Sequence, residues 1–529
     1  MVTTIGLIAL VAPPNNWDSM TYHMSRVMHW IQNQSVSFYP THILRQLHQN
    51  PWAEFAIMHF QILSDSDRFA NIIQWFSMIG SIVGVSLIAK QLGANSRGQV
   101  FAAVVVVSIP MGILQASSTQ NDYVVSFWLV CFVYYSMLLT TEQSLADSIA
   151  AGASLGLAIL TKATAYIYAL PFLLWSACSI LKRLRWRAWK PLLVILTVTL
   201  LLNFGHYARN FELFGNPLGP GQESPSGVHK YTNDQLSVSI ILSNCIRNVG
   251  LHIGTPIKQL NAITEKAIYS LHGLLNIDPN DPRTTWAKTK FRMPSISYSE
   301  DLAGNPTHLV LIVISIMVLV FWKQLRDSRN LIRYFIALTT AFLLFCVVLK
   351  WQPWHSRLHL PIFVLWSPLI GIVLSRTLNS RKASIVILLI ILTAIPWILY
   401  NKSRPLIRSN NVIVTRRIVQ YFMQRPELKD PYNGVANFLN SQTTCEDIGL
   451  MSGGDSWEYP FWVLLEKNGV RTIRIEHVNV TNPSGTIPIR FNPCAIISTL
   501  PIKGGEIATE ESLFYRELSA GPISVFLRE

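Results

Sequence analysis

Apolar segments of membrane-spanning length recur along this chain of 529 residues, and no other feature restricts its fold as strongly. A hydrocarbon core of roughly 30 Å takes about 20 consecutive apolar residues in a helix. Charged residues make up 14% of the sequence, a deficit against the roughly 25% of soluble domains. The pattern therefore predicts a polytopic α-helical membrane protein.

We predict about eleven spans, and the first of them is apparently incomplete. They comprise residues 1–12, 69–90, 100–118, 123–139, 148–161, 163–181, a segment from 191, 306–322, 334–349, 360–375 and 383–400. The first run, MVTTIGLIALVA, is shorter than a span and lacks the basic start and cleavage site of a signal peptide. We interpret it as the end of a span whose beginning is missing, or as a short helix that a thinned bilayer accommodates.

Short basic loops set the predicted orientation, because such loops stay in the cytoplasm. Arg97 and the loops 182–190, 323–333 and 376–382 are placed inside. This arrangement needs two crossings between residues 148 and 181, with Lys162 at a tight outer turn. The polar segments that then lie outside are 13–68, 119–122, 208–305, 350–357 and 401–529.

Two domains follow from this map: a transmembrane domain, residues 1–400, and an extracytoplasmic domain, residues 401–529. Strands are predicted within 447–453, 471–478, 494–500 and 522–529, and a helix within 457–469 that closes at Gly469. The second domain is therefore expected to be α/β. Cys445 and Cys494 could pair there, since disulfides form outside the cytoplasm.

The net charge of +14 would suit a nucleic-acid-binding protein if the chain were soluble. Here the basic residues lie in short loops between apolar runs, as orientation in a bilayer requires. Nucleic acid is therefore not expected as a partner. An anionic lipid or lipid phosphate fits the basic surface better.

Ionisable residues gather at the predicted outer face. Asp18 follows the first span by a few residues, and Asp122 directly precedes the fourth, so both carboxylates should lie at one depth. Intramembrane and membrane-edge charges of this kind suggest a functional site. The other ionisable residues predicted at this level are His23, Arg26, His48, Glu54, Lys162, Arg209, His355 and Arg357.

Each of these residues also has an ordinary structural explanation. Taken alone, Asp18 is expected to be a solvated acid in a loop. Asp122 suits a helix N-terminus, where Asn and Asp cap and a carboxylate is favoured. Lys162 could extend to the interface from a helix end. His355 and Arg357 could anchor lipid headgroups beside tryptophans of an aromatic belt.

The order of the motifs resembles that of GT-C glycosyltransferases, closest to the protein mannosyltransferase and lipid A aminoarabinose transferase type. The matching stretches are WDSMTYH, HQNPWAEF, STQNDYVVSFW, GLAILTKAT, RNFELFGNPL and SRLHLP. The resemblance covers roughly residues 10 to 375. Ser19 stands where the family usually has a glutamate after its first aspartate, so a paired-carboxylate mechanism does not carry over.

The resemblance implies transfer of a sugar from a polyprenyl-phosphate carrier to a protein, lipid or glycan acceptor at the outer face, with inversion at the sugar carbon. Asp18 would act as general base or orient the acceptor, and Asp122 would hold neighbouring groups. The predicted ligands of substrate and carrier phosphate are Arg209, Lys162, Arg357, His23, His355, Tyr22 and Glu54. Some relatives use a divalent metal, but with a lone Asp18 none is expected here.

Two other classes remain open at this point: a secondary transporter or lipid or polysaccharide flippase, and an inactive scaffold that binds envelope glycans. A transporter predicts an internal repeat and broken helices near the midplane. The two halves of this sequence do not resemble each other, and its ionisable residues lie at span ends. We therefore expect a membrane glycosyltransferase in a bacterial inner membrane.

Overall fold

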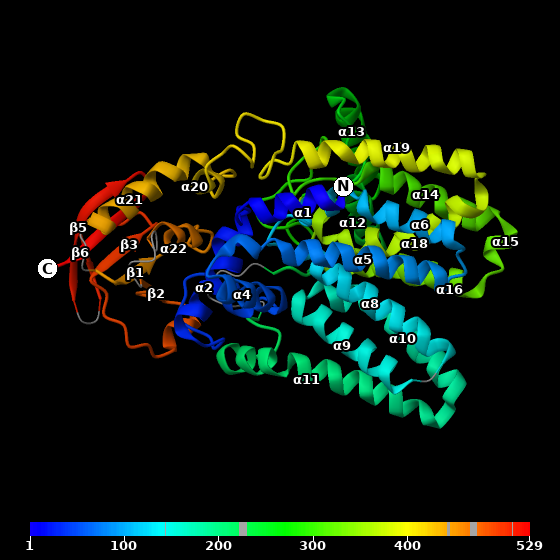
Figure 1. Ribbon diagram of the computed structural model, residues 1–529, viewed down its shortest axis with the longest axis horizontal. Coiled ribbons are helices and arrows are strands. Elements are labelled where there is room, and N and C mark those ends of the chain that lie inside the picture. Colours follow the sequence, from blue (N-terminus) through cyan, green and yellow to red (C-terminus); the bar gives the residue numbers. More distant parts are fainter. Residues whose placement is uncertain (143, 222–229, 442–444, 466–472, 510–511) are drawn as a thin grey trace.

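The protein has two parts, a bundle of apolar helices and a smaller sheet domain. The computed structural model describes residues 1–142, 144–221, 230–441, 445–465, 473–509 and 512–529. Figure 1 shows the bundle at one end of the long axis and the sheet at the other. Helices α2 (Met24–Asn33) and α4 (Trp52–Ser64) lie between the two parts in this view.

Eleven apolar helices correspond to the eleven predicted spans in the described part of the chain. They are α1 (Val2–Val11), α5 (Ile72–Gln91), α6 (Ser96–Val107), α8 (Asp122–Thr141), α9 (Leu145–Thr161), α10 (Thr164–Leu184), α11 (Trp189–Phe214), α14 (Pro306–Phe321), α16 (Arg329–Val348), α18 (Leu360–Thr377) and α19 (Ser380–Leu399). Six helical segments are long and apolar enough to cross a membrane, and the segment 164–214 contains both α10 and α11. The other four helices, α1, α6, α9 and α14, are shorter apolar helices.

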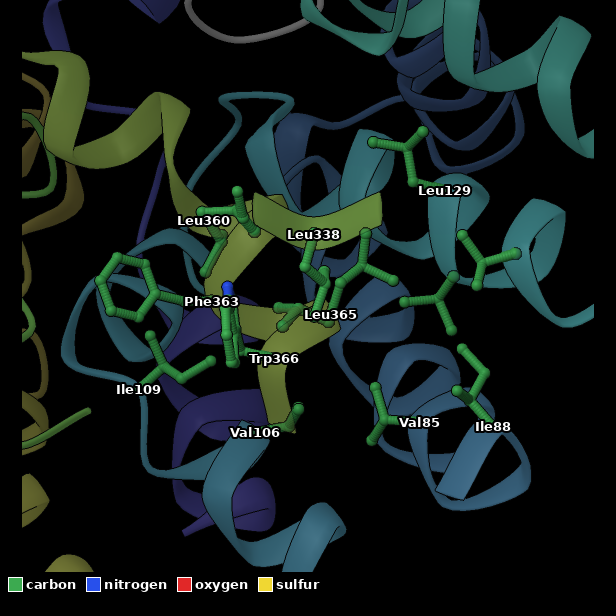
Figure 2. Close-up of a cluster of buried hydrophobic side chains, with 14 of the residues drawn as sticks. Val85, Ile88, Val106, Ile109, Leu129, Leu338, Leu360, Phe363, Leu365 and Trp366 are labelled. Atoms are coloured by element: carbon green, nitrogen blue, oxygen red, sulfur yellow. The ribbon is translucent and has the colours of Figure 1, made fainter. Parts of the chain in front are cut away.

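Helix α18 forms the centre of the bundle. In its most apolar stretch of 18 residues, 83% of the residues are buried, whereas the corresponding share in α19 is 28%. Figure 2 shows residues of α18, among them Phe363 and Trp366, packed among side chains of α5, α6 and α8. A Cβ atom on Gly371 would lie 2.5 Å from the Gly98 carbonyl oxygen, so the backbones of α18 and α6 approach closely. Small residues permit such approaches between membrane helices.

The span predicted at 100–118 is divided in the structure. Helix α6 ends at Val107, and the short helix α7 (Pro110–Gln115) follows. Pro110 has no N–H and cannot continue the hydrogen bonding of α6, so it starts a new helix instead. The Met111 N–H donates to Asn305 Oδ1 at 3.0 Å, which ties α7 to the residue before α14.

The polar segments between the spans are largely helical. Segment 13–68 contains a π-helical turn (Ser19–His23), α2, α3 (Arg45–His48) and α4, followed by a 3₁₀ turn (Asp67–Phe69). Segment 208–305 contains α12 (Val238–Gly250) and α13 (Lys258–Leu274). Helix α11 continues to Phe214 and ends where Gly215 takes a left-handed conformation, so Arg209 lies inside that helix. The described residues of the membrane part also contain the short helices η3 (Arg185–Ala188), α15 (Lys323–Arg326) and α17 (His355–Leu358).

The C-terminal domain is α/β, as the sequence predicts. Its six-stranded sheet has the order β2-β1-β3-β6-β5-β4 and comprises β1 (Asp447–Met451), β2 (Arg474–His477), β3 (Ala495–Ser498), β4 (Glu506–Ala508), β5 (Leu513–Ala520) and β6 (Ile523–Arg528). The pairs β1–β2 and β1–β3 are parallel and the rest antiparallel. Helices α21 (Lys429–Ser441) and α22 (Tyr459–Leu465) pack with this sheet domain. The short elements α20 (Arg417–Gln420) and η4 (Pro426–Leu428) precede α21, and η5 (Pro483–Thr486) follows β2.

All four predicted strands are present, whereas β4, β5 and α21 were not predicted. Cys445 and Cys494, which the sequence leaves as a possible pair, form a disulfide bond. The predicted end of α22 at Gly469 lies outside the described residues.

Candidate active site

Asp18 lies at the start of the π-helical turn that joins α1 to α2. Such turns are rare and occur often at functional sites. Arg357, in the short helix α17, donates through Nη2 to Asp18 Oδ2 at 2.7 Å across a sequence separation of 339 residues. Arg45 Nη1 lies 4.0 Å from the other oxygen. The Asp18 side chain is 12% exposed, so it is a paired and mostly buried acid and not a solvated loop residue.

The surrounding charges decide the protonation of Asp18. Burial alone would raise the pKa of its carboxyl. The positive charges of Arg357 and Arg45 and the hydrogen bond from Arg357 outweigh burial and hold that pKa well below its ordinary value. Asp18 is therefore a carboxylate at neutral pH.

Asp301, which was not predicted from the sequence, shares Arg357 with Asp18. Arg357 Nη1 donates to Asp301 Oδ1 at 3.1 Å, and Gln120 Nε2 donates to the same oxygen at 2.8 Å. Burial raises the pKa of Asp301 to about 6, Arg357 opposes the rise, and Glu300 and Asp18 add to it. Asp122 is a candidate because it directly precedes an apolar span. Asp301, in the stretch SEDLAGNP directly before the apolar run of α14, satisfies the same criterion.

Asp122 pairs with Lys162, a residue predicted at the same depth. Lys162 Nζ donates to Asp122 Oδ1 at 2.6 Å. Asp122 is the first residue of α8 and its carboxylate makes no capping hydrogen bond; its Oδ2 atom is buried without a partner. Lys162 stands in the turn between α9 and α10 and is 18% exposed. The carboxylate thus serves an ion pair and not a helix cap.

The two ion pairs belong to one electrostatic group. Burial lowers the pKa of Lys162, while the charges of Asp122 and, more weakly, Asp18 raise it and that of Arg357 lowers it further. Burial likewise acts to lower the pKa of Arg357, but Asp18, Asp301 and Asp122 raise it well above its ordinary value. Three carboxylates and three cations, Arg357, Lys162 and Arg45, are therefore brought together from distant parts of the chain.

Tyr22, His23 and Glu54 lie beside this group. His23 Nδ1 is hydrogen bonded to Glu54, and Arg26 Nη1 lies 3.8 Å from the same oxygen. The Arg45 guanidinium lies 5.2 Å from the centre of the Tyr22 ring. Burial, followed by the charge of Asp18, raises the pKa of Tyr22 well above its ordinary value, so its hydroxyl stays protonated.

Arg209 lies in a second cationic group. Its guanidinium lies 5.9 Å from the centre of the Phe38 ring, and its Nε atom is buried without a partner. Arg26 and His48 also carry buried nitrogen atoms without partners. Burial, helped by the charges of Arg26 and Arg45, lowers the pKa of His48 to about 3, so this imidazole is neutral.

His355 has different partners from Arg357, which lies two positions further along the chain. Its Nδ1 atom bonds to Asn248 Oδ1 at 2.9 Å, and its ring lies edge-on to Phe345. Burial lowers the pKa of His355 to about 3. Within the described residues, no hydrogen bond or ion pair joins His355 or Arg209 to Asp18.

Comparisons with known proteins agree with this architecture. Residues 50–206 match the family model described as dolichyl-phosphate-mannose-protein mannosyltransferase. Two crystal structures of ArnT from Cupriavidus metallidurans are similar over 99% of this chain and 96% of theirs, at 13% identity. The one bound to undecaprenyl phosphate gives a TM-score of 0.54, and the apo state gives 0.53. No curated protein sequence matches the chain.

The structural match extends beyond the membrane helices to the C-terminal sheet domain, because it covers nearly the whole of both chains. The fold implied by the motif order is thereby confirmed. The chain has the GT-C glycosyltransferase fold of the protein mannosyltransferase and aminoarabinose transferase type.

Proposed function

We propose that this protein is a membrane glycosyltransferase that moves a sugar from a polyprenyl-phosphate carrier to an acceptor hydroxyl or amine. The observation that carries the proposal is the group formed by Asp18, Asp122 and Asp301 around Arg357 and Lys162. Arg357 and Lys162 are each partly exposed, at 13% and 18%, so substrate groups can reach them. The fold, with its match to a family of sugar-phosphate-dependent transferases, supports the same reading.

The reaction needs a base and a cation. A carboxylate takes the proton of the acceptor, the acceptor atom bonds to the sugar carbon, and the carbon–oxygen bond to the phosphate breaks. Its electron pair leaves with the polyprenyl phosphate. A positioned base contributes roughly 10²–10⁴-fold, and cations stabilise the charge that develops on the leaving phosphate.

Arg357 links these two requirements. Its guanidinium fork, which suits phosphate as well as carboxylate, is shared between Asp18 and Asp301. A carrier phosphate that binds Arg357 competes with Asp18 for the same N–H groups. Asp18 then loses part of the interaction that depresses its pKa and becomes a stronger base when the donor is in place. Asp122 keeps Lys162 directed toward this centre.

Tyr22, His23 and Glu54 border the acceptor side in this proposal, while Arg209 and His355 are not part of the group around Asp18. Arg209, whose Nε atom has no hydrogen-bond partner, fits a second anionic part of a substrate, while Arg26 is completely buried and pairs with Glu54. The site faces the outer side of the inner membrane, with the C-terminal domain on that side, consistent with the disulfide bond.

Binding of the carrier tests the proposal. Native mass spectrometry of the purified full-length protein with added undecaprenyl phosphate should show one bound lipid. Lys162→Met and Arg357→Gln should each weaken that binding at least tenfold. Arg187→Gln, at an exposed position in the basic loop after α10, is the matched control and should bind as the wild type does. Equal binding by all four proteins would overturn the assignment.

Deletion of the protein identifies the acceptor, because the product glycan or glycolipid should disappear from the envelope. An unaltered envelope, together with lipid movement across vesicles containing the purified protein, would instead support a flippase.

A further inference from the structure

A second cluster of ionisable side chains lies where segment 13–68 meets the C-terminal domain. His29 comes from α2, Glu458 directly precedes α22, and His477 ends β2. The three side chains are almost completely buried, and one ligand atom of each lies within 4.8 Å of the others. Residues more than 400 positions apart thus place two imidazoles around one carboxylate.

Both imidazoles direct a nitrogen at Glu458. His29 Nε2 lies 2.7 Å from Oε1 and His477 Nε2 lies 3.1 Å from Oε2. The other ring nitrogen of His29 faces Glu476 Oε2 at 3.8 Å, and neither of these two buried atoms has a hydrogen-bond partner. A metal-bound histidine typically directs its second nitrogen at a carboxylate, which fixes the ring.

Charge also favours a cation at this position. Glu458 and Glu476 are both buried, and Arg474, which is 39% exposed, is the guanidinium that contacts Glu476. Gln46 Nε2 and Trp462 Nε1 also donate to Glu458, but both groups are neutral, so the charge of the two buried carboxylates is balanced by Arg474 and by either a proton on His29 or a bound cation. Isolated buried charges are expensive, so carboxylates in such places pair or coordinate metals.

We propose that His29, Glu458 and His477 bind a divalent transition-metal ion, with zinc as the best fit. Two imidazole nitrogens and one carboxylate are donors that zinc accepts, with a further position left for water. Glu476 orients His29 and is not a ligand. The ion holds α2 against β2 and α22 and so fixes the turn that carries Asp18. This role goes beyond the proposed transfer reaction and assigns the ion no part in it.

Metal analysis of the full-length protein, purified through a tag without histidines, tests the proposal. Inductively coupled plasma mass spectrometry should find about one zinc per chain, because the three ligands form a single site. Glu458→Gln, which keeps the size of the side chain, should lose at least nine-tenths of the metal. Glu476→Gln should weaken binding roughly 10- to 100-fold, as loss of a carboxylate behind a ligating histidine does. His59→Ala, at an exposed histidine of α4, is the matched control.

X-ray absorption at the zinc edge supplies an independent readout and should show nitrogen and oxygen ligands at about 2.0–2.1 Å. The competing arrangement is a metal-free, hydrogen-bonded cluster with the extra proton on His29. The main-chain N–H of His42, 3.4 Å from His477 Nδ1, is compatible with that arrangement. Protein that folds without bound metal, or metal content equal in Glu458→Gln and wild type, would overturn the proposal.

Discussion

Lys162→Met isolates the contribution of the Lys162–Asp122 pair to stability. The Asp122 side chain is 1% exposed, and Lys162 is the partner of its Oδ1 atom, while Oδ2 already lacks one. Removing Lys162 leaves a buried carboxylate with no hydrogen-bond partner for either oxygen in the described contacts. Breaking a buried pair from one side costs roughly 3–5 kcal/mol. Lys162 is 18% exposed, so water relieves part of the penalty and we expect a value near the lower end, about 3 kcal/mol.

The double variant Lys162→Met with Asp122→Asn separates charge from packing. It removes both charges, and replacing a whole buried pair by neutral groups is often close to neutral. Its thermal midpoint in detergent should therefore return to within a few degrees of the wild type, while the single variant melts well below it. Lys90→Met, at an exposed lysine near the end of α5, is the control for loss of a lysine alone. A single variant as stable as the wild type, or a double variant less stable than the single one, would refute the reasoning.

Three further predictions follow from other parts of the molecule. Cys494→Ser removes the disulfide bond to Cys445, which closes a loop of 49 residues. The added entropy of the unfolded chain should destabilise the C-terminal domain by about 4 kcal/mol, and the domain should be cleaved earlier in limited proteolysis. Asp301 has its pKa raised to about 6, so its ionised form is lost as pH falls through 6; transfer should decline there, and Asp301→Asn should abolish that inflection in the pH profile. The same raised pKa means that ionising Asp301 costs stability as pH rises from about 4 through 6, so the variant should melt with less pH dependence in this interval. Arg357→Lys retains the charge but lacks the planar fork that spans Asp18 and Asp301. Donor affinity should therefore fall at least tenfold in a lipid-binding titration, and retained affinity would show that the fork is not required.

The membrane helices could be predicted from the sequence because hydropathy is a local property. Each of the eleven spans coincides with a helix, and the local exception is the division at Pro110, where the ring of one residue ends α6. In the C-terminal domain, the four strands with dense apolar residues were predicted. The strand β5 was missed because Phe514 is the one buried residue among its eight, so it has no dense apolar run, and β4 because it has three residues.

The candidate site could be predicted in part. Counting crossings places Asp18, Asp122, Lys162 and Arg357 at one level, and the structure brings these four together. The pairing of Arg357 with Asp18, 339 residues away, depends on how α17 packs against the turn at Asp18. No local sequence pattern predicts that packing. For the same reason the rotation of His355 toward Asn248 could not be foreseen.

Asp18→Asn tests the central claim most directly. Asparagine keeps the size of the side chain and can still accept a hydrogen bond from Arg357, so the variant should insert and fold normally. Transfer from a labelled polyprenyl-phosphate sugar in membranes should fall by roughly 10²–10⁴-fold, the contribution of a positioned base. Transfer at the wild-type rate by a normally inserted Asp18→Asn protein would contradict the account.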